Sequence, residues 1–497
     1  MSNNPNVVKA GSSRVWTIEG GPGPTRAPSY QGCMRIGDTS YGFGDITKIE
    51  CPDPARYGQF VEVARAQGEK ARPTFSIQAR YQFQLSELLR IARKRCGLEV
   101  HVNLGECEDP QNYNAGWEKI RVYPDSIFTS WADENAGALE SGDNNPTNET
   151  VESSAADTYE IKRLAFEELD PVGFVREVTA VEVCDAASCG DDCGPTSEGC
   201  SKVFFAESGT GATPGTKPRI RYTANGGETF GESILTSFFS NEAVDDMACV
   251  AGNLVVVSST AGMHWANIQD ILEDDEVWAE TFTGFVINKL PAAITSIDAS
   301  HTWLAGIGGY IYFSADPTGS VVVQNAGIAT TQDLQAIHAY DADHIVAVGK
   351  ANAVVWSQNG GATWALVTGP APAVALHTVW MHSPTTWFIG DENGKLWYTT
   401  DAGESWAQKT LPGTPTFIDH IVFSNQTVGY LSARRAGKGY IYRTLDGGYS
   451  WYVLPEGSSQ QPIPTNTYIN QIAVCWDVNR VYGGGLNGVD GFAVVGA

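Results

Sequence analysis

A nine-residue phrase that recurs in the second part of the chain constrains its fold more than any other feature. Each copy places Asp or Asn, then Gly, then Ser or Thr, ahead of an aromatic residue, and the copies span Tyr222–Phe230, Trp356–Trp364, Tyr398–Trp406 and Arg443–Trp451. Asp or Asn can hydrogen-bond its own turn, Gly accepts positive φ, and the hydroxyl caps the turn before the next strand. The phrase therefore predicts tight hairpin turns, whose structural residues are Asn225, Gly227, Asn359, Gly361, Asp401, Gly403, Asp446 and Gly448.

The spacing of these turns predicts the architecture. The residues expected to open the strand after each turn recur at intervals of forty-odd residues, and they are Phe230, Trp278, a weak position near Val321, Trp364, Trp406 and Trp451. A period of this length, with four strands in each unit, is typical of β-propeller blades. We expect these aromatic residues to pack between neighbouring blades.

Residues 171–497 are predicted to form a seven-bladed propeller, with six blades as the alternative. The second and third turns, Asp270–Trp278 and Ser314–Ser320, keep their position but lose most of the phrase. Three further strands are expected after Trp451, one fewer than a blade requires. A strand from the 159–183 region is predicted to complete the seventh blade and close the ring.

The repeated phrase resembles the Asp-box (BNR) repeat, which joins the third and fourth strands of a propeller blade in many proteins. The stretches Val348–Trp364 and Phe388–Trp406 also resemble, more loosely, the propellers of photosystem assembly factors. That family pairs its propeller with a leader peptide and an arginine patch. We expect neither in this sequence, in which a whole domain precedes the repeats.

Residues 31–170 are predicted to form a separate β domain, a sandwich or barrel with one helix. Phe60–Arg65 and Thr74–Tyr81 alternate as strands do, and Leu85–Arg95 carries its apolar residues at helical spacing. Further strands are expected at Leu98–Leu104 and Tyr159–Phe166, with a polar loop over Ala132–Pro146. Residues 1–30 show no periodicity and are predicted to form an extended arm, either disordered or docked on a neighbouring subunit.

The order of these elements resembles the tail-tube proteins of long-tailed bacteriophages. The resemblance is carried by the helix that begins at Leu85 and by Gly44–Ile49, Gly68, Arg72–Phe75 and Val102–Gly105. It implies homo-oligomeric, hexameric rings that stack into a DNA conduit, contact other tail proteins, and belong to a virion assembled in the host cytoplasm. The propeller is then expected to be displayed outward as a decoration domain that touches surface glycans weakly.

The charge of the chain argues against nucleic acid and membrane partners. Its formal net charge is -25, with 18 basic and 25 acidic residues in 1–170 against 14 basic and 32 acidic residues in 171–497. An acidic surface of this kind repels DNA and anionic lipid. The sequence also shows no signal peptide and no apolar run long enough to span a membrane.

Four of the ten cysteines gather in one stretch, at Cys184, Cys189, Cys193 and Cys200. Two local disulfides within this loop, free thiols and a zinc site are three alternatives. The paired Cys-x-x-Cys knuckles of structural zinc sites do not occur in the stretch. Local disulfides that pin a long loop are the interpretation we favour.

The sequence does not predict an enzyme, a catalytic residue, a metal site or a cofactor. A sialidase needs a cluster of arginines, but those of the propeller do not recur at matching positions: Arg176, Arg219, Arg221, Arg434, Arg435, Arg443 and Arg480. The histidines fall about one per blade, and hydrogen bonds to neighbouring backbone are expected for His264, His301, His338, His344, His377, His382 and His420.

Three functions follow, in order of preference. The first is a virion structural protein, a tail-tube subunit that carries an outward propeller. The second is a propeller that binds a carbohydrate or a protein and is mounted on an adaptor domain. A glycosidase is a distant third.

Overall fold

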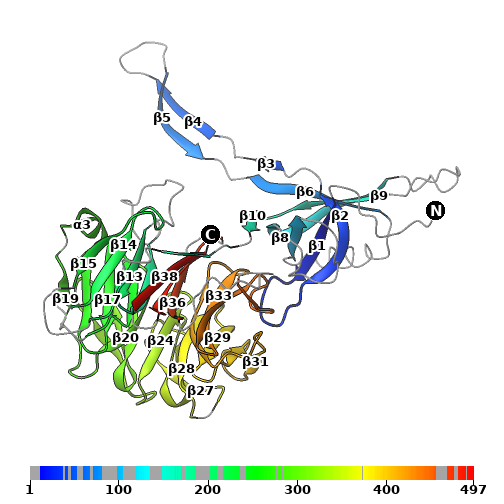
Figure 1. The fold of residues 1–497 in the computed structure, drawn as a ribbon. Helices are drawn as coiled ribbons and strands as arrows, with labels where there is room; N and C mark the ends of the chain where they lie inside the picture. Colours follow the sequence, from blue (N-terminus) through cyan, green and yellow to red (C-terminus); the bar gives the residue numbers. More distant parts are fainter. Residues whose placement is uncertain are drawn as a thin grey trace, which may run out of the picture. The chain divides into compact units, whose positions relative to one another are not determined.

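The computed structural model places the chain in two compact units, Met1–Arg163 and Leu164–Ala497 (Figure 1). The residues it describes are 12–36, 40–42, 46–52, 60–67, 71–80, 98–104, 119–134, 148–162, 164, 166–169, 174–184, 202–209, 217–235, 242–275, 277–281, 284–371, 373–454, 467–474, 479–487 and 490–496. The boundary between the units lies seven residues before the predicted boundary at 170/171. No helix within these ranges has the length and apolar character needed to span a bilayer.

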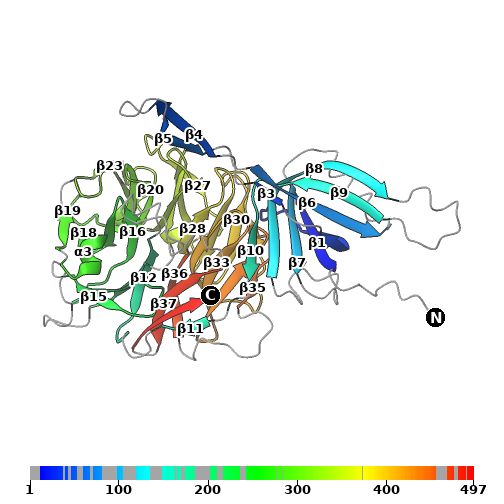
Figure 2. The same ribbon diagram turned by 90° about the horizontal axis from the view of Figure 1, so that it is seen from above.

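The first unit is an eight-stranded antiparallel sheet that closes on itself through hydrogen bonds (Figure 2). The cycle runs β1–β2–β6–β9–β8–β7 and returns to β1, because the long strand β8 pairs with β7 along its first half and with β9 along its second. The strands are β1 (Ser12–Glu19), β2 (Ser29–Ile36), β3 (Ser40–Gly42), β6 (Ala71–Arg80), β7 (Leu98–Leu104), β8 (Lys119–Glu134), β9 (Asn148–Ser154) and β10 (Tyr159–Lys162). A separate hairpin joins β4 (Ile46–Pro52) to β5 (Phe60–Gln67).

The interior of this sheet is apolar, as a closed sheet of this size requires. Val15, Val100 and Val102 are essentially inaccessible to solvent and belong to one cluster of buried side chains. Phe75 and Tyr123 stack within the same cluster, with ring centroids 3.9 Å apart. The cluster therefore joins β1, β7, β6 and β8 into one core.

Three predictions for this part of the chain are corrected. The prediction of an extended arm over residues 1–30 is wrong for residues 12–30, because β1 lies in the sheet between β2 and β7. The predicted strand Tyr159–Phe166 is divided between β10 of the first unit and a strand of the second. The polar loop predicted from Ala132 begins later, since β8 continues to Glu134. The predicted helix at 85–95 lies outside the described residues.

The second unit contains seven four-stranded antiparallel sheets, in each of which consecutive strands are neighbours. The first three are β12 (Val178–Val183) to β15 (Gly231–Ile234), β16 (Asp246–Val250) to β19 (Ala279–Thr281), and β20 (Pro291–Asp298) to β23 (Val322–Ala326). The next three are β24 (Leu334–Ala339) to β27 (Ala365–Thr368), β28 (Leu376–Met381) to β31 (Ala407–Lys409), and β32 (Phe417–Phe423) to β35 (Tyr452–Val453).

The second and third strands of these six sheets lie between the first and fourth strands given above. They are β13 (Val203–Glu207), β14 (Arg219–Thr223), β17 (Asn253–Ser258), β18 (Gly262–Asn267), β21 (His301–Gly306), β22 (Tyr310–Ser314), β25 (Ile345–Gly349), β26 (Ala353–Ser357), β29 (Trp387–Asp391), β30 (Leu396–Thr399), β33 (Gly429–Arg435) and β34 (Lys438–Thr444). The short helix α3 (Ile268–Glu273) stands between β18 and β19, where the second turn has lost the repeated phrase.

The last sheet combines strands from both ends of the second unit. β36 (Thr467–Val474), β37 (Val481–Asn487) and β38 (Asp490–Gly496) come from the C-terminal part, and β11 (Phe166–Glu168) supplies the fourth strand. Phe166 pairs with Gly496 in an antiparallel ladder. The strand predicted from the 159–183 region to complete this sheet is therefore β11.

The sheets form a propeller-like ring, because the first strands of consecutive sheets contact one another in a closed cycle. The order is β12, β16, β20, β24, β28, β32 and β36, after which β36 contacts β12. In Figure 1 the C-terminal strands return beside the first sheet of this unit. The first strand of each sheet therefore lines the centre of the ring, and we call it the innermost strand of its sheet. The fourth strand lies at the rim.

The residues after the repeated turns pack where neighbouring sheets meet. Phe230, Trp278, Val321, Trp364, Trp406 and Trp451 each directly precede the outermost strand of their sheet. Trp278 belongs to an apolar cluster that joins the first and second sheets, and Trp451 to one that joins the fifth and sixth. The aromatic residues of the phrase thus contribute to the cores between sheets.

A disulfide joins the first two sheets, which corrects the predicted cysteine pairing. Cys184, which directly follows β12, is bonded to Cys249 of β16. The expected local disulfide at Cys184 is therefore wrong. Because β12 and β16 are neighbouring innermost strands, Cys184 lies beside a residue that is 65 positions away in the sequence. The other three cysteines of the predicted cluster, Cys189, Cys193 and Cys200, lie outside the described residues.

Candidate functional site

The strand order divides the connections of the ring between its two ends. In an antiparallel four-stranded sheet, the turns after the first and third strands emerge at one end, and the connections after the second and fourth strands emerge at the other. The repeated phrases join third to fourth strands. They therefore lie at the same end of the ring as the turns between first and second strands.

Each repeated turn is held by one network of hydrogen bonds around its Asp or Asn. Asp401 accepts from the Ser405 backbone N–H at 2.9 Å and from the Thr399 hydroxyl at 2.6 Å. The Gly403 N–H donates to the same hydroxyl at 2.9 Å, and Gly403 has a φ of +85° that favours glycine. The Ser405 hydroxyl also donates to Asp401 Oδ2 at 2.5 Å; this bond, followed by those from the Thr399 hydroxyl and the Ser405 N–H, lowers the pKa of Asp401 to about 2. The same network surrounds Asn225, Asn359 and Asp446.

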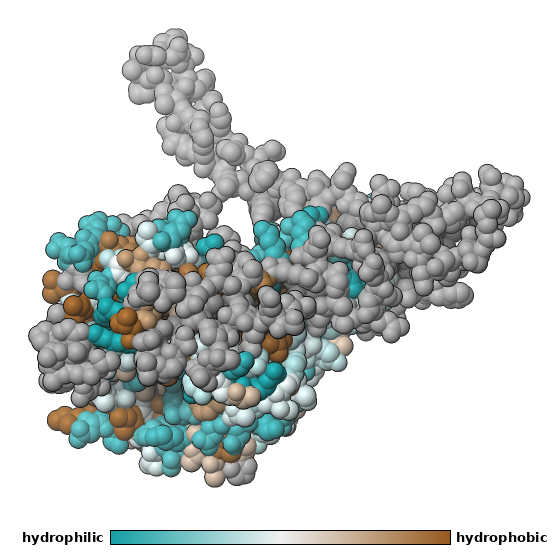
Figure 3. Space-filling model, in the orientation of Figure 1, coloured by the Kyte–Doolittle hydropathy of each residue, from teal (hydrophilic) through white to brown (hydrophobic). Residues whose placement is uncertain are grey.

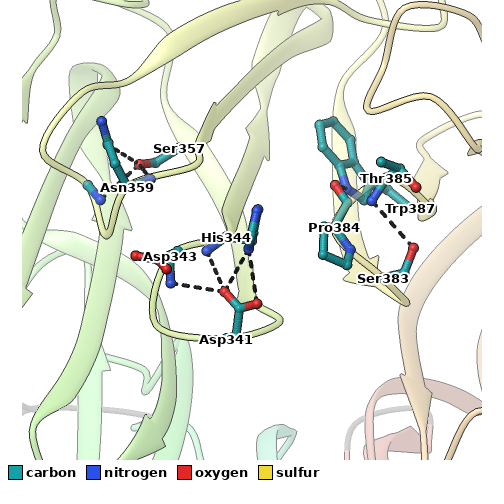
Figure 4. A network of polar contacts seen from close by, with 10 residues as sticks. Asp341, Asp343, His344, Ser357, Asn359, Ser383, Pro384, Thr385 and Trp387 are labelled. Atoms are coloured by element: carbon teal, nitrogen blue, oxygen red, sulfur yellow. Dashed lines mark hydrogen bonds and ion pairs between the residues drawn. The ribbon is translucent and has the colours of Figure 1, made fainter.

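Figure 4 shows this end of the fourth and fifth sheets at close range. Asn359 bonds to Ser357 in a repeated turn, and Asp341 bonds to His344 in the neighbouring first-to-second-strand turn at 2.8 Å. Trp387 donates its indole N–H to the Pro384 carbonyl oxygen in the corresponding turn of the next sheet. All of these groups bond within their own turns, so we assign this end a structural role.

The opposite end of the ring is shaped by a recurrent β-bulge. In six of the seven innermost strands, the register shifts at the second, third or fourth residue, which leaves one residue unpaired. A bulge of this kind turns the side chain of the extra residue away from its regular direction. The extra residues are Thr179, Ala292, Gln335, His377, Asp419 and Asn470.

Four of these extra residues line a cavity of about 340 Å³. The cavity lies at the centre of the ring, at the end opposite the repeated turns, because its lining residues stand near the start of innermost strands or near the end of a second strand. The lining consists of Thr179, Val244, Asp245, His377, Phe417, Asp419, Arg434 and Asn470. We call this cavity the channel mouth.

Asp419 and Arg434 form a charge pair within the channel mouth. The Arg434 Nε donates to Asp419 Oδ1 at 2.7 Å. The guanidinium also lies over two aromatic rings, 4.7 Å from the centre of Phe417 and 4.8 Å from that of Tyr468. Burial raises the pKa of Asp419 to about 6, against the opposing effect of Arg434. The Arg434 side chain is therefore held in place by stacking on the two rings and by its bond to the Asp419 carboxylate.

The remaining polar groups of the mouth are held by neighbours. Asn470 donates its amide to Glu177 Oε1 at 2.9 Å and to the Val178 carbonyl oxygen at 3.0 Å. Asp245 accepts from the Ser259 backbone N–H, and desolvation raises its pKa. Burial lowers the pKa of His377, whose ring lies 4.4 Å from that of Phe417. His377 is therefore neutral at neutral pH.

Below the mouth, a side chain bridges each junction between neighbouring innermost strands. At the junction of β32 and β36, His420 bonds to the backbone of Ile472. At the other six, the side chain of one strand accepts a hydrogen bond from a backbone N–H of the next, in the acceptor–donor pairs Gln471–Val181, Glu182–Cys249, Asp246–Ile294, Thr295–Ala339, His338–Met381 and Thr378–Ile421. These six bonds satisfy N–H groups that face a neighbouring innermost strand rather than a ladder.

Two of the predicted histidines belong to this set of bridges. Burial lowers the pKa of His338 to about 3, with His420 and His382 adding to the effect, and it lowers that of His420 to about 4. The expectation that they bond to neighbouring backbone is met. His301 and His344 bond instead to Asp298 and Asp341 inside their own turns.

The predicted site residues are thus separated from the cavity that the structure forms. The residues of the repeated turns lie at one end of the ring and the channel mouth at the other. Of the propeller arginines, Arg434 lines the mouth, while Arg443 is buried over the Tyr430 ring. No group of three or more metal-ligating side chains placed to hold an ion occurs within the described residues.

Of the residues that line the mouth, sequence analysis singled out only His377 and Arg434, and neither for a role in a binding site. Thr179, His377, Asp419 and Asn470 share no chemistry, and what they share is a position one to three residues into an innermost strand. Aligning the predicted first strands of the blades would have placed them in one column. The bulge that turns them inward has no residue signature in this chain.

Known proteins resemble the second unit. Residues 318–461 match the family described as photosynthesis system II assembly factor YCF48. Among solved structures, YCF48 from Cyanidioschyzon merolae is 12% identical over 67% of this chain and 98% of its own, with a TM-score of 0.48. YCF48 bound to D1 peptide is also 12% identical, over 67% and 94%, with a TM-score of 0.48. A streptogramin B lyase structure is 12% identical over 67% and 97%, with a TM-score of 0.49. No curated protein matches the chain.

Proposed function

We propose that the chain is a non-enzymatic binding protein whose propeller recognises a polypeptide at the channel mouth. The seven four-stranded sheets act as the blades of one closed ring, and the N-terminal unit serves as the adaptor that carries it. The observation that carries the proposal is the recurrent bulge, which directs chemically different side chains from separate sheets into one cavity. The partial match to an assembly-factor family supports a binding role.

The surface of the mouth end favours a polypeptide over a carbohydrate. Exposed aliphatic side chains stand on connections that emerge there, and Ile287 and Ile328 are 85% and 88% exposed. Apolar side chains at these positions are available to pack against a polypeptide bound at the mouth. The exposed tyrosines Tyr340 and Tyr449, which could stack on sugars, belong to turns at the opposite end. On the face seen in Figure 3, hydrophobic residues of this unit form small separate patches among hydrophilic ones.

The contacts that Asp419 and His377 make support binding rather than catalysis at the mouth. Asp419 is engaged by Arg434, and His377 makes ring contact with Phe417. Nucleophilic catalysis requires a nucleophile within hydrogen-bond reach of a base, and neither group is paired with a hydroxyl or a thiol in this way. We therefore infer binding without turnover.

A peptide array tests this proposal. The full chain is expected to bind a subset of capped peptides, and Thr179→Tyr, which fills the mouth, is expected to abolish that binding. Thr363→Tyr places the same side chain in a repeated turn at the other end and serves as the matched control. Equal binding by both variants, or no bound peptide at all, would contradict the proposal. A glycan array on the same protein distinguishes the carbohydrate alternative.

A second candidate function is the tail-tube subunit of a virion, with the propeller as outward decoration. What favours it is the first unit: a sheet that closes through β8, with a separate hairpin, β4–β5, attached to it. This arrangement is compatible with the resemblance of residues 31–170 to tail-tube proteins. Electron microscopy of the purified chain is the test. Stacked hexameric rings with peripheral knobs are expected, and a monomer at all concentrations contradicts it.

A further inference from the structure

We propose that the channel mouth selects a positively charged side chain, lysine or arginine, of the bound polypeptide, and that Asp419 and Asp245 recognise it. This inference rests on the proposed function and names the chemistry of its ligand. Three independent features of the mouth support it: its charge, its unused hydrogen-bond capacity, and its apolar wall.

The charge around the mouth is negative. Asp245 and Asp419 line it, and Glu177 bonds to the lining residue Asn470, whereas Arg434 is the one cation among the lining residues. The neighbouring His377 is neutral at neutral pH because burial lowers its pKa. A cationic ligand group therefore reduces the charge repulsion at this site, and an anionic one increases it.

Arg434 and Asn470 already donate hydrogen bonds within the mouth, while one buried acceptor receives none. Arg434 donates to Asp419 Oδ1 and, at 3.3 Å, to Asn470 Oδ1, and Asn470 donates to Glu177 and to backbone. Asp419 Oδ2 has no hydrogen-bond partner among the described residues, although its side chain is 3% exposed. A buried carboxylate oxygen without a partner is costly. A ligand that brings donors removes that cost.

The apolar wall of the mouth suits the stem of a long cationic side chain. Val244 is a fully buried residue of the lining, and the Phe417 ring contacts both the His377 ring and the Arg434 guanidinium. Lysine and arginine bury their methylene stems against such surfaces while their charged heads remain with polar groups. Arg434 is a positioning residue in this arrangement, because its bond to Oδ1 orients Asp419.

Matched peptides test the inference with the full chain. A peptide selected on the array is synthesised in versions that carry Lys, Arg, Gln or Glu at the residue whose replacement weakens binding most. The Lys or Arg version is expected to bind about thirtyfold more tightly than the Gln version, and the Glu version more weakly still. Raising the salt concentration should narrow this difference.

Variants of the protein locate the effect. Asp419→Asn and Asp245→Asn keep the shape of the side chain, remove its charge, and are each expected to reduce the preference for Lys over Gln at least tenfold. Glu404→Gln makes the same charge change in an exposed position of a repeated turn and should leave the preference unaltered. Thermal unfolding of each variant reports folding. Should Asp419→Asn fail to fold, Asp245→Asn carries the test alone.

The outcomes separate the two proposals. Peptides that bind at the mouth but show no preference for Lys or Arg, or prefer Glu, overturn this inference and leave the binding function standing. A Lys preference that survives both Asn variants also overturns it, since the cation is then recognised elsewhere. Absence of any bound peptide removes the binding function, and with it this inference.

Discussion

His338 on β24 accepts a hydrogen bond from the backbone N–H of Met381, at the end of β28, with 3.3 Å between the Nδ1 and N atoms. The two residues belong to neighbouring sheets, and their bond is one of six in which a side chain of one innermost strand accepts from a backbone N–H of the next. Because the acceptor is an imidazole nitrogen, the bond requires a neutral histidine. The integrity of the ring is therefore coupled to pH at this junction.

Acid is predicted to destabilise the second unit through His338 and His420. Their folded pKa values of about 3 and about 4 lie below the ordinary 6.5, so between these limits the unfolded chain binds more protons. The stability they support is complete above pH 6.5 and is lost as the pH falls toward 3. Asp246 and Asp419 act oppositely, since burial raises each pKa to about 6 from 3.8.

Urea unfolding at pH 7 and pH 5 measures this balance. His338→Gln keeps an acceptor that does not titrate, and it is expected to reduce the loss of stability between the two pH values. His301→Gln, in an exposed turn where the histidine bonds to Asp298, is the control and should change little. An unchanged pH dependence in His338→Gln would show that this histidine does not carry the effect.

Loss of the repeated-turn carboxylate should cost most where the turn is buried. Asp446 is fully buried and accepts from the Ser450 N–H at 2.9 Å and the Thr444 hydroxyl at 2.8 Å. Asp446→Ala leaves these donors unpaired and is expected to lower the free energy of unfolding by about 2–3 kcal/mol. Asp401→Ala, in a more exposed turn, should have a smaller effect. Asp446→Asn is the control, because Asn359 fills the same role; chemical denaturation compares all three.

The disulfide between Cys184 and Cys249 is predicted to stabilise the junction of the first two sheets. It closes a loop across a separation of 65 residues, for which loop-closure entropy predicts about 4 kcal/mol. Cys184→Ser and Cys249→Ser should each lower the melting temperature in the absence of reductant. Reductant should bring the unmodified protein close to both variants. If titration of the denatured, unreduced protein finds all ten cysteines as free thiols, the bond is absent.

Strand β11 is predicted to be necessary for a stable ring. A fragment that begins at Leu164 retains β11 and should unfold cooperatively, whereas one that begins at 172 leaves the edge of β38 unpaired. We expect the shorter fragment to melt at a lower temperature and to associate through that exposed edge. Differential scanning calorimetry and light scattering compare the two, and equal behaviour would mean that β11 does not close the ring.

The features predictable from sequence were those encoded within a few consecutive residues. Asp401, Gly403 and Ser405 meet inside one turn, so their pattern reports the turn directly. The four-strand unit and the strand that completes the last sheet followed from the spacing of such turns. The last sheet lacks the repeated phrase because its third and fourth strands come from opposite ends of the unit, so no turn joins them.

Features that depend on distant neighbours were missed. The strand β1 is buried on both faces although it carries Ser13, Arg14 and Thr17, so it lacks the alternation that identifies a half-exposed strand. Cys184 pairs with the adjacent innermost strand rather than with its own loop. Asp419 reaches the channel mouth through a register shift, which depends on its partner strand β33 as much as on its own sequence.

The pairing of Phe166 with Gly496 places the two chain ends of the propeller unit on neighbouring strands of one sheet. In this antiparallel ladder, the end of β38 stands beside the start of β11, so a short linker between them would complete an ordinary hairpin. The ring is therefore a candidate for circular permutation, with new termini opened at any connection between sheets. In evolutionary terms, no blade needs to be the first, and the whole unit can be gained or exchanged as a cassette without disturbing the order of its blades.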